Sequence, residues 1–327
     1  MESSVIDVVI GIIRDQQGNI LLSKRNPGSH QGSLWEFPGG KKKQGESDIE
    51  ALNRELQEEL GIQVITPRFF MKLRYIYPDC QVELSAWYVD RWEGKPHSRE
   101  GQQVEWIEPG KLADLDFPPA NKKLIKAMRL PRLYLICPFP GNNHTEFINR
   151  IESFIRAGVN LLQLRCDETV LYSNKVVVNK AYEICESNDA ILMINAKPES
   201  VEVLDAHGIH LKSSRLLQLS ERPVDNNYYL SASCHTIDEI EHANKIDVDF
   251  ITVSPVCQTG SHPESVPMGW KMFGEITAYS DIPVYALGGM LPFHMKDALK
   301  SGANGIAVLS GIWHARNPEE VIRQCHN

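Results

Sequence analysis

The sequence lacks any apolar run of about 18 residues, the length needed to cross a membrane. Its first residues lack the basic region and apolar core of a secretory signal. Its seven cysteines are scattered and form no Cys-x-x-Cys pair, which disfavours a disulfide framework and a zinc site. These absences predict a cytoplasmic protein with free thiols and no membrane partner.

The chain also lacks an excess of positive charge. It carries 34 Lys and Arg against 42 Asp and Glu, and the acidic excess lies almost entirely after residue 130. Because a polyanion binds mainly through Lys and Arg, polymeric nucleic acid is an unfavourable partner. A small anionic ligand held through metal ions fits this composition better.

A length of 327 residues predicts two domains, 1–130 and 131–327, with Pro131 at the boundary. In the first, residues 5–13 and 20–23 are predicted strands that form a hairpin around Asp15. Gly39-Gly40 is a predicted loop, residues 47–60 a helix, 70–76 and 81–91 strands, and 121–130 a closing helix. The expected fold is α+β, with a mixed sheet between helices.

After Pro131, short β-branched runs alternate with helical stretches, which indicates a (β/α)8 TIM barrel. The predicted strands are 133–137, 161–165, 191–194, 208–211, 229–233, 250–254, 283–287 and 305–309.

The second half of the helix predicted over 47–60 carries Glu55, Glu58 and Glu59 at positions i, i+3 and i+4. This spacing places them on one face, where three like charges destabilise an isolated helix. Bound Mg²⁺, which prefers carboxylate and phosphate oxygens, would offset that repulsion. The alternative is a solvated acidic face. An opposite stripe of Ile49, Leu52, Leu56 and Leu60 is predicted to fix the helix, and Gly61 to end it.

The pattern Gly40-(5)-Glu46-(7)-Arg54-Glu55-Leu56-Gln57-Glu58-Glu59-Leu60-Gly61-Ile62 resembles the Nudix box at every fixed position. Residues 4–130 resemble the MutT-type 8-oxo-dGTP diphosphatases, in VVIGIIRDQQGNILLSKR, LWEFPGGK, RELQEELGI, RWEGKPHSREGQ and DFPPAN. The resemblance implies metal ligands at Gly39 (through its carbonyl), Glu55, Glu58, Glu59 and Glu100. It implies substrate contacts at Arg25, His30, Glu36, Phe37, Pro38, Gly39 and Asn121.

By this resemblance, Asn121 reads the oxidised purine. Its amide offers both a donor and an acceptor, which match the carbonyl oxygen and the extra N–H of 8-oxoguanine. Unmodified guanine has an acceptor at that ring nitrogen, and the resulting mismatch discriminates against it. Asn121 as a helix N-cap and His30 as a surface-loop residue are the structural alternatives.

The implied reaction is attack of a metal-activated water on a phosphorus of 8-oxo-dGTP, which yields 8-oxo-dGMP and pyrophosphate. This reaction would remove a mutagenic nucleotide from the pool. Mg²⁺ is the expected cofactor, with Mn²⁺ as a substitute. The general base is assigned to Glu55 on position, with Glu100 as its rival.

Residues 131–327 resemble the thiamine-phosphate synthase and thiazole tautomerase family, in LLQLR, MIN, GIHL, SASCHT, IPVYALGGM and GANGIAVLSGIW. The expected ligand is a phosphorylated thiazole or a thiamine-like molecule. The candidate ligand site comprises strand-end residues, namely Arg165, Asn195, His235, Gly288, Gly289, Ser310 and Gly311.

The chain departs from the synthases at their acidic magnesium ligands. Ala196 follows the asparagine of MIN, and Ser214 and Arg215 stand where the second acidic residue is expected. The lysine of the loop after the sixth strand is also not evident. These losses argue against thiamine-phosphate synthesis. His235 matches the tautomerase histidine, although a structural role is an equal alternative.

Two further functional hypotheses remain open from the sequence. The fusion suggests that the hydrolase acts on pyrophosphates of the thiamine pathway. Alternatively, the barrel is a non-catalytic module that senses a phosphorylated ligand.

Overall fold

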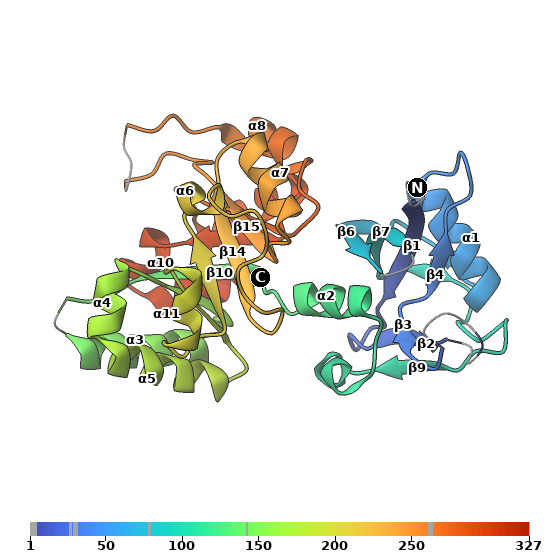
Figure 1. Ribbon diagram of the computed structural model, residues 1–327, viewed down its shortest axis with the longest axis horizontal. Coiled ribbons are helices and arrows are strands. Elements are labelled where there is room, and N and C mark those ends of the chain that lie inside the picture. Colours follow the sequence, from blue (N-terminus) through green and yellow to red (C-terminus); the bar gives the residue numbers. More distant parts are fainter. Residues whose placement is uncertain are drawn as a thin grey trace. The chain divides into compact units, whose positions relative to one another are not determined.

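The computed structural model describes residues 5–25, 28, 32–77, 80–141, 143–260 and 264–326. The chain divides into two compact units, one ending at Arg129 and one beginning at Leu130. Figure 1 traces the first in blue to green and the second from green to red. No helix in the described ranges is long and apolar enough to cross a membrane.

The first unit is built on a four-stranded mixed sheet in the order β4-β1-β7-β6. Strands β1 and β7 are parallel, whereas β4 and β6 are antiparallel to their neighbours. A second, antiparallel sheet has the order β3-β2-β9, and β5 pairs with β8. The strands are β1 (Val5–Ile13), β2 (Ile20–Lys24), β3 (Trp35–Glu36), β4 (Gly39–Lys41), β5 (Gln63–Val64), β6 (Arg68–Ile76), β7 (Gln81–Val89), β8 (Trp92–Glu93) and β9 (Val104–Ile107). The helices are α1 (Asp48–Leu60), the 3-10 helix η1 (Pro109–Asp114) and α2 (Pro119–Met128).

The predicted mixed α/β architecture is confirmed, but two local predictions are wrong. The hairpin of β1 and β2 is reduced to a single bridge between Arg14 and Ile20, because the two strands enter different sheets. The Gly-Gly segment is part of strand β4, not a loop.

Local sequence signals set both ends of α1. Ser47 forms a capping box with Glu50, and Gly61 ends the helix in the left-handed conformation at φ 69°. Its buried face is Ala51, Leu52, Leu56 and Leu60. Ile49, predicted to belong to that face, is only half-buried.

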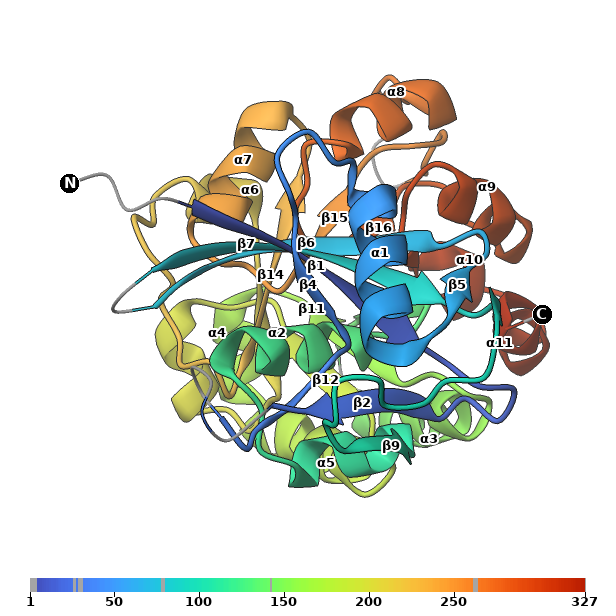
Figure 2. The ribbon, with the colours of Figure 1, turned by 90° about the vertical axis from the view of Figure 1, so that its right-hand side faces the viewer.

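Helix α1 packs across the four-stranded sheet (Figure 2). Its leucines meet residues of β1 and β7, including Val9, Ile13 and Val89, in one core cluster. A side chain at Gly11 would lie 2.9 Å from the Leu56 Cδ1, so the glycine permits the close approach of helix and strand.

The second unit is a closed barrel of eight parallel strands, which follow one another around it in sequence order. The strands are β10 (Leu133–Pro138), β11 (Leu161–Arg165), β12 (Ile191–Ile194), β13 (Gly208–Leu211), β14 (Tyr229–Cys234), β15 (Phe250–Val253), β16 (Val284–Ala286) and β17 (Gly305–Val308). The helices are α3 (His144–Arg156), α4 (Glu168–Ser173), α5 (Lys175–Glu186), α6 (Ser213–Leu216), α7 (Ile237–Lys245), α8 (Gly269–Thr277), α9 (Met295–Lys300), α10 (Ser310–Trp313) and α11 (Pro318–His326), with 3-10 helices η2 (Pro198–Glu202) and η3 (Pro292–His294).

The predicted (β/α)8 barrel is therefore confirmed. All eight predicted strand ranges coincide with observed strands to within one residue at either end. The link from β12 to β13 contains only the short helix η2, which helps the barrel to close within fewer than 200 residues. Tyr134, Phe250 and Tyr285 fill the barrel interior with mutually packed rings, with centroids 5.5 to 5.6 Å apart.

We expect Leu56→Ala to destabilise the first unit by about 2–5 kcal/mol, because Leu56 is fully buried and its loss leaves a cavity. Differential scanning calorimetry of the full chain measures this, with the exposed neighbour Gln57→Ala as the control. Equal losses in the two variants would contradict the assigned packing of α1.

Candidate functional site

Glu55, Glu58 and Glu59, the candidate metal ligands of α1, differ in their surroundings. The Glu58 side chain is 50% exposed and that of Glu55 only 15% exposed. Arg54 donates to the Glu55 carboxylate at 2.5 Å and approaches Glu58 at 3.4 Å, and it also pairs with Glu46. Part of the repulsion that the sequence indicated is therefore offset by Arg54 within the chain itself.

Glu59 lies at the centre of the acidic group. Burial and the nearby charges of Glu36, Glu100 and Glu55 raise the pKa of Glu59 to about 8. The Gly39 N–H donates a hydrogen bond to Glu59 Oε2 at 3.2 Å. The fold therefore brings four predicted or neighbouring carboxylates within electrostatic reach of one another, although they are up to 64 positions apart in sequence.

The two glycines of β4 make this arrangement possible. A side chain on Gly39 would lie 2.1 Å from the Val9 carbonyl oxygen, and its φ of 149° also excludes most other residues. A side chain on Gly40 would lie 2.3 Å from Glu55 Oε2. The carboxylate of Glu55 therefore rests directly against the backbone of β4.

The chemistry of these donors fits a hard divalent cation. Burial first, and then the charges of neighbouring glutamates, disfavour the ionised form of Glu59, and bound Mg²⁺ or Mn²⁺ would stabilise that ionised form. Within the described ranges, no three His, Cys, Asp or Glu side chains converge closely enough to hold a metal ion.

Asn121 is buried in the first turn of α2, and its side-chain Oδ1 has no hydrogen-bond partner among the residues that the structure describes. The N-cap position belongs to Pro118, so the interpretation of Asn121 as a helix N-cap is wrong. An unpartnered buried acceptor costs free energy unless something outside the chain completes it.

Arg25 and Glu36 face each other in an ion pair of 2.6 Å. Burial raises the pKa of Glu36 even though Arg25 opposes that shift. The Nε of Arg25 is buried and has no hydrogen-bond partner in the described part of the chain. The Trp35 N–H donates to the Asp116 carbonyl at 2.9 Å, which ties this segment to the DFPPAN segment that carries Asn121.

The remaining predicted contacts have different environments. Phe37 is 1% exposed and stacks on Phe117, and Pro38 is also buried. Both side chains therefore pack in the interior of the first unit and hold the segment that carries Glu36 in place. His30 lies outside the described residues.

Sequence reasoning missed Tyr77, whose hydroxyl interacts with the backbone of Ala120 and the charge of Arg25. No local pattern marks this residue.

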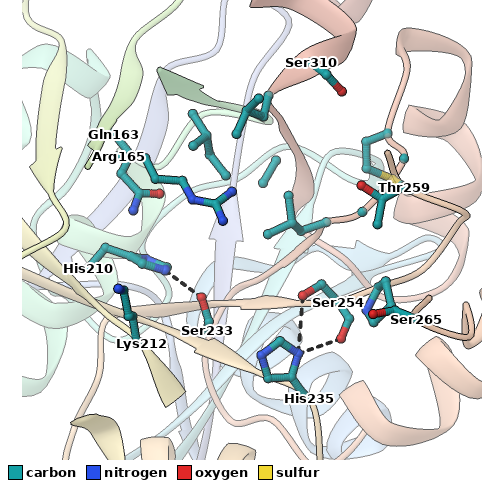
Figure 3. Close-up of a pocket in the computed structure, with 18 of the residues that line it drawn as sticks. Gln163, Arg165, His210, Lys212, Ser233, His235, Ser254, Thr259, Ser265 and Ser310 are labelled. Carbon is teal, nitrogen blue, oxygen red and sulfur yellow. Dashed lines mark hydrogen bonds between the residues drawn. The ribbon is translucent and has the colours of Figure 1, made fainter. Parts of the chain in front are cut away.

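The barrel contains a cavity of about 430 Å³ at the carboxyl ends of its strands (Figure 3). Six of the predicted barrel residues line it, namely Arg165, Asn195, His235, Gly288, Gly289 and Ser310. Gly311 is not among the described lining residues. A side chain there would lie 2.7 Å from the Met290 carbonyl oxygen, so its role is close packing.

Comparison with known proteins identifies both units. Residues 133–312 match the sequence profile of the thiamine monophosphate synthase family, and residues 9–127 match that of the NUDIX domain. The chain belongs to both families. Its Nudix domain precedes its thiamine-phosphate synthase domain.

Individual relatives support each half separately. The 8-oxo-dGTP diphosphatase of Escherichia coli K12 is 41% identical over 124 residues, which cover 38% of this chain and 96% of the relative. A putative thiamine-phosphate synthase 2 of Aquifex aeolicus is 33% identical over 185 residues, which cover 56% of this chain and 98% of the relative. The solved thiamine phosphate pyrophosphorylase of Pyrococcus furiosus, 19% identical, covers 61% of this chain and 94% of its own with a TM-score of 0.50, and it supports the barrel fold alone.

Several lining residues of the synthase domain were missed by sequence reasoning. Gln163, His210, Lys212 and Ser233 all face the cavity. Each lies two positions from another lining residue on the same strand or its end. The period of two that governs strands could therefore have found them.

His210 is held neutral at the base of this cavity. Its ring nitrogens contact the Ser231 hydroxyl at 2.9 Å and the Ser233 hydroxyl at 2.8 Å. Burial, followed by the charge of Arg165, lowers the pKa of His210 to about 3. His235 is more exposed, and its Nδ1 lies 2.8 Å from the Ser254 carbonyl oxygen.

This lowered pKa predicts a pH-dependent stability of the synthase domain. Below the ordinary value of 6.5 the unfolded chain binds a proton at His210 that the folded domain does not, so stability falls as pH falls from 6.5 towards 3. His210→Gln should remove about 2 kcal/mol of the stability difference between pH 7.5 and pH 5. Urea unfolding at both pH values measures it, and parallel pH profiles for wild type and variant would contradict it.

Proposed function

We propose that the Nudix domain hydrolyses 8-oxo-dGTP to 8-oxo-dGMP and pyrophosphate with Mg²⁺, or with Mn²⁺ as a substitute. The observation that carries this proposal is the buried, unpartnered Oδ1 of Asn121. The likeness to the Escherichia coli 8-oxo-dGTP diphosphatase, which spans nearly all of that protein, supports it. Removal of oxidised nucleotides would be the resulting role.

Recognition of the purine base would depend on the Oδ1 of Asn121 in α2, which lacks a partner within the described residues. Asn121 Oδ1 would accept the extra N–H of 8-oxoguanine, and its amide N–H₂ would donate to a carbonyl oxygen of the base. Arg25 has a buried Nε without a partner and lies against Glu36, which supports a role at the nucleotide. Unmodified guanine would leave the Asn121 acceptor opposite another acceptor, so its binding would be weaker.

The acidic group would hold the metal ions. Glu55, Glu58, Glu59, Glu100 and the Gly39 carbonyl are the proposed ligands. A bound cation would neutralise substrate phosphates and acidify a water. We assign the general base to Glu55, which rests against β4, with Glu100 as the alternative.

One observation favours a second substrate class. A thiamine-phosphate synthase domain in the same chain suggests hydrolysis of pyrophosphates of the thiamine pathway. A steady-state panel of 8-oxo-dGTP, dGTP and thiamine-pathway pyrophosphates separates the two. If 8-oxo-dGTP is turned over no faster than dGTP, the proposed sanitation function fails.

For the barrel we propose binding of a small phosphorylated ligand, such as a thiazole phosphate. Arg165, Asn195, Gly288, Gly289 and Ser310 would contact it. Backbone N–H groups at the ends of the late barrel strands are suited to phosphate. If the barrel converts its ligand, His235 is the proposed catalytic residue. Substitution of His235 would then abolish conversion and leave binding of the ligand intact.

Glu59→Gln should lower hydrolysis by about 100-fold or more, because it removes a metal ligand from the centre of the acidic group. Initial rates at saturating Mg²⁺ measure the loss. Glu93→Gln, at an exposed glutamate of β8, is the matched control and should retain normal turnover. Near-normal activity of the Glu59 variant would refute the metal assignment.

Asn121→Ala should lower the ratio of kcat/KM for 8-oxo-dGTP to that for dGTP by about tenfold or more. The reason is the loss of the amide that distinguishes the two bases. Asn53→Ala is the control. The Asn53 side chain accepts the Val64 N–H at 3.0 Å and donates to the Ile49 carbonyl at 3.1 Å, so its loss should leave the ratio unchanged. Equal losses on both substrates would reduce Asn121 to a structural residue.

A further inference from the structure

The loop of residues 97–102 docks on the carboxyl end of α1, and we call it the capping loop. The last carbonyl groups of a helix have no hydrogen-bond partner within the helix. The capping loop supplies partners from outside. The Glu59 carbonyl accepts from the Arg99 N–H at 3.0 Å, and the Leu60 carbonyl accepts from the His97 N–H at 3.2 Å.

The capping loop also brings a positive charge to that end of the helix. The last turn of α1 contains no basic residue, although the helix dipole favours a cation there. The Arg99 guanidinium takes this position and donates to the Gln57 carbonyl at 2.8 Å. Gly61 permits the approach of the loop, because a side chain there would lie 2.8 Å from the His97 Cε1. Hydrogen bonds, charge and close packing therefore all hold the loop against the helix.

Gln102 joins the interior of the capping loop to the helix through its carboxamide. Its Oε1 accepts from the Ser98 hydroxyl at 3.0 Å and from the Glu100 N–H at 3.1 Å. Its Nε2 donates to the Glu59 carbonyl at 3.4 Å. Gln102 is only 9% exposed, and a buried amide costs free energy unless its hydrogen bonds are made. Here the loop provides the donors and the helix provides the acceptor.

Gln102 thereby links the backbone of Glu100 to the backbone of Glu59. The charge of Glu100 is among those that, after burial, raise the pKa of Glu59, so the two carboxylates lie within electrostatic reach of each other. Their mutual repulsion favours departure of the capping loop from the helix, and the hydrogen bonds of Gln102 oppose it. Glu100 itself is exposed, so its backbone is held while its carboxylate stays accessible.

We propose that Gln102 is a positioning residue of the Nudix domain, which holds Glu100 beside α1 before a cation arrives. A carboxamide suits this task, because it accepts from the loop and donates to the helix at the same time. The inference rests on the proposed assignment of Glu59 and Glu100 as metal ligands. It adds that the capping loop is preorganised, and that Gln102 contributes to metal affinity through Glu100.

Gln102→Met removes the carboxamide and keeps the length of the side chain. We expect it to weaken Mn²⁺ binding by the full chain about tenfold, since residues that orient a metal ligand contribute about 10–100-fold to metal affinity. Titration with Mn²⁺ followed by electron paramagnetic resonance measures this without nucleotide and without turnover. Gln103→Met is the matched control and should keep the affinity, because Gln103 is exposed and its side chain donates to the exposed Glu105.

A double-mutant cycle with Glu100→Gln separates positioning from a general loss of structure. Glu100→Gln removes the carboxylate that Gln102 is proposed to place. If Gln102 acts through Glu100, adding Gln102→Met to Glu100→Gln should change the Mn²⁺ affinity by no more than about twofold. A further loss of about tenfold in the double variant would contradict the inference, because Gln102 would then act on other parts of the site.

Hydrogen exchange of the metal-free chain reports on the capping loop itself. The amides of Arg99 and Glu100 should exchange about tenfold faster in Gln102→Met, because the loop opens more often. Unchanged exchange at both amides would also overturn the inference. Circular dichroism checks the fold. If Gln102→Met folds poorly, Ser98→Ala removes only one hydrogen bond of the Gln102 Oε1 and should weaken Mn²⁺ binding about threefold.

The outcomes separate the inference from the proposal beneath it. An unchanged Mn²⁺ affinity in Gln102→Met would overturn the positioning role alone. An unchanged affinity in Glu100→Gln would overturn the assignment of Glu100 as a metal ligand, and the inference with it. Failure to hydrolyse 8-oxo-dGTP would overturn the proposed substrate only, because Mn²⁺ binding and hydrogen exchange are measured without nucleotide.

Discussion

Burial of one face of α1 fixes the candidate site of the Nudix domain. Leu52, Leu56 and Leu60 are completely buried against the sheet, and a helix held on one side has no freedom to turn the other. Two glycines set how closely it approaches. A side chain at Gly11 would meet Leu56, and one at Gly40 would meet Glu55. The same close packing therefore stabilises the domain and places the acidic face against β4.

The electrostatics of that face follow from this placement. Arg54 compensates Glu55 and part of Glu58, but Glu59 is held among other carboxylates at partial burial, and its pKa rises to about 8. Such a group is a strong acceptor for a proton or for a divalent cation. A buried carboxylate with a raised pKa among other carboxylates is the kind of group that a metal-dependent hydrolase can use.

The barrel has the opposite polarity at its own candidate site. Its cavity presents Arg165 and Lys212 rather than glutamates, and its buried histidine is neutral because burial and Arg165 disfavour the imidazolium. The acidic face of the Nudix domain suits phosphates only through a cation, whereas the barrel cavity suits an anion directly. On the functions proposed here, the two domains would bind phosphorylated molecules by two different physical means.

The sequence by itself determined the parts of the fold that depend on neighbours along the chain. The capping box of Ser47 and the left-handed Gly61 bound α1 through local hydrogen bonds, and the buried parallel strands of the barrel are visible as short apolar runs. The Nudix box likewise lies within one contiguous segment. Only the tertiary structure decided which partners distant residues meet. It separated β1 from β2 because β1 pairs with the remote β7, it left the Oδ1 of the buried Asn121 without a partner among the described residues, and it brought Arg165 and Lys212 to the lining of one cavity. These contacts depend on how strands and helices pack in space, which no local pattern encodes.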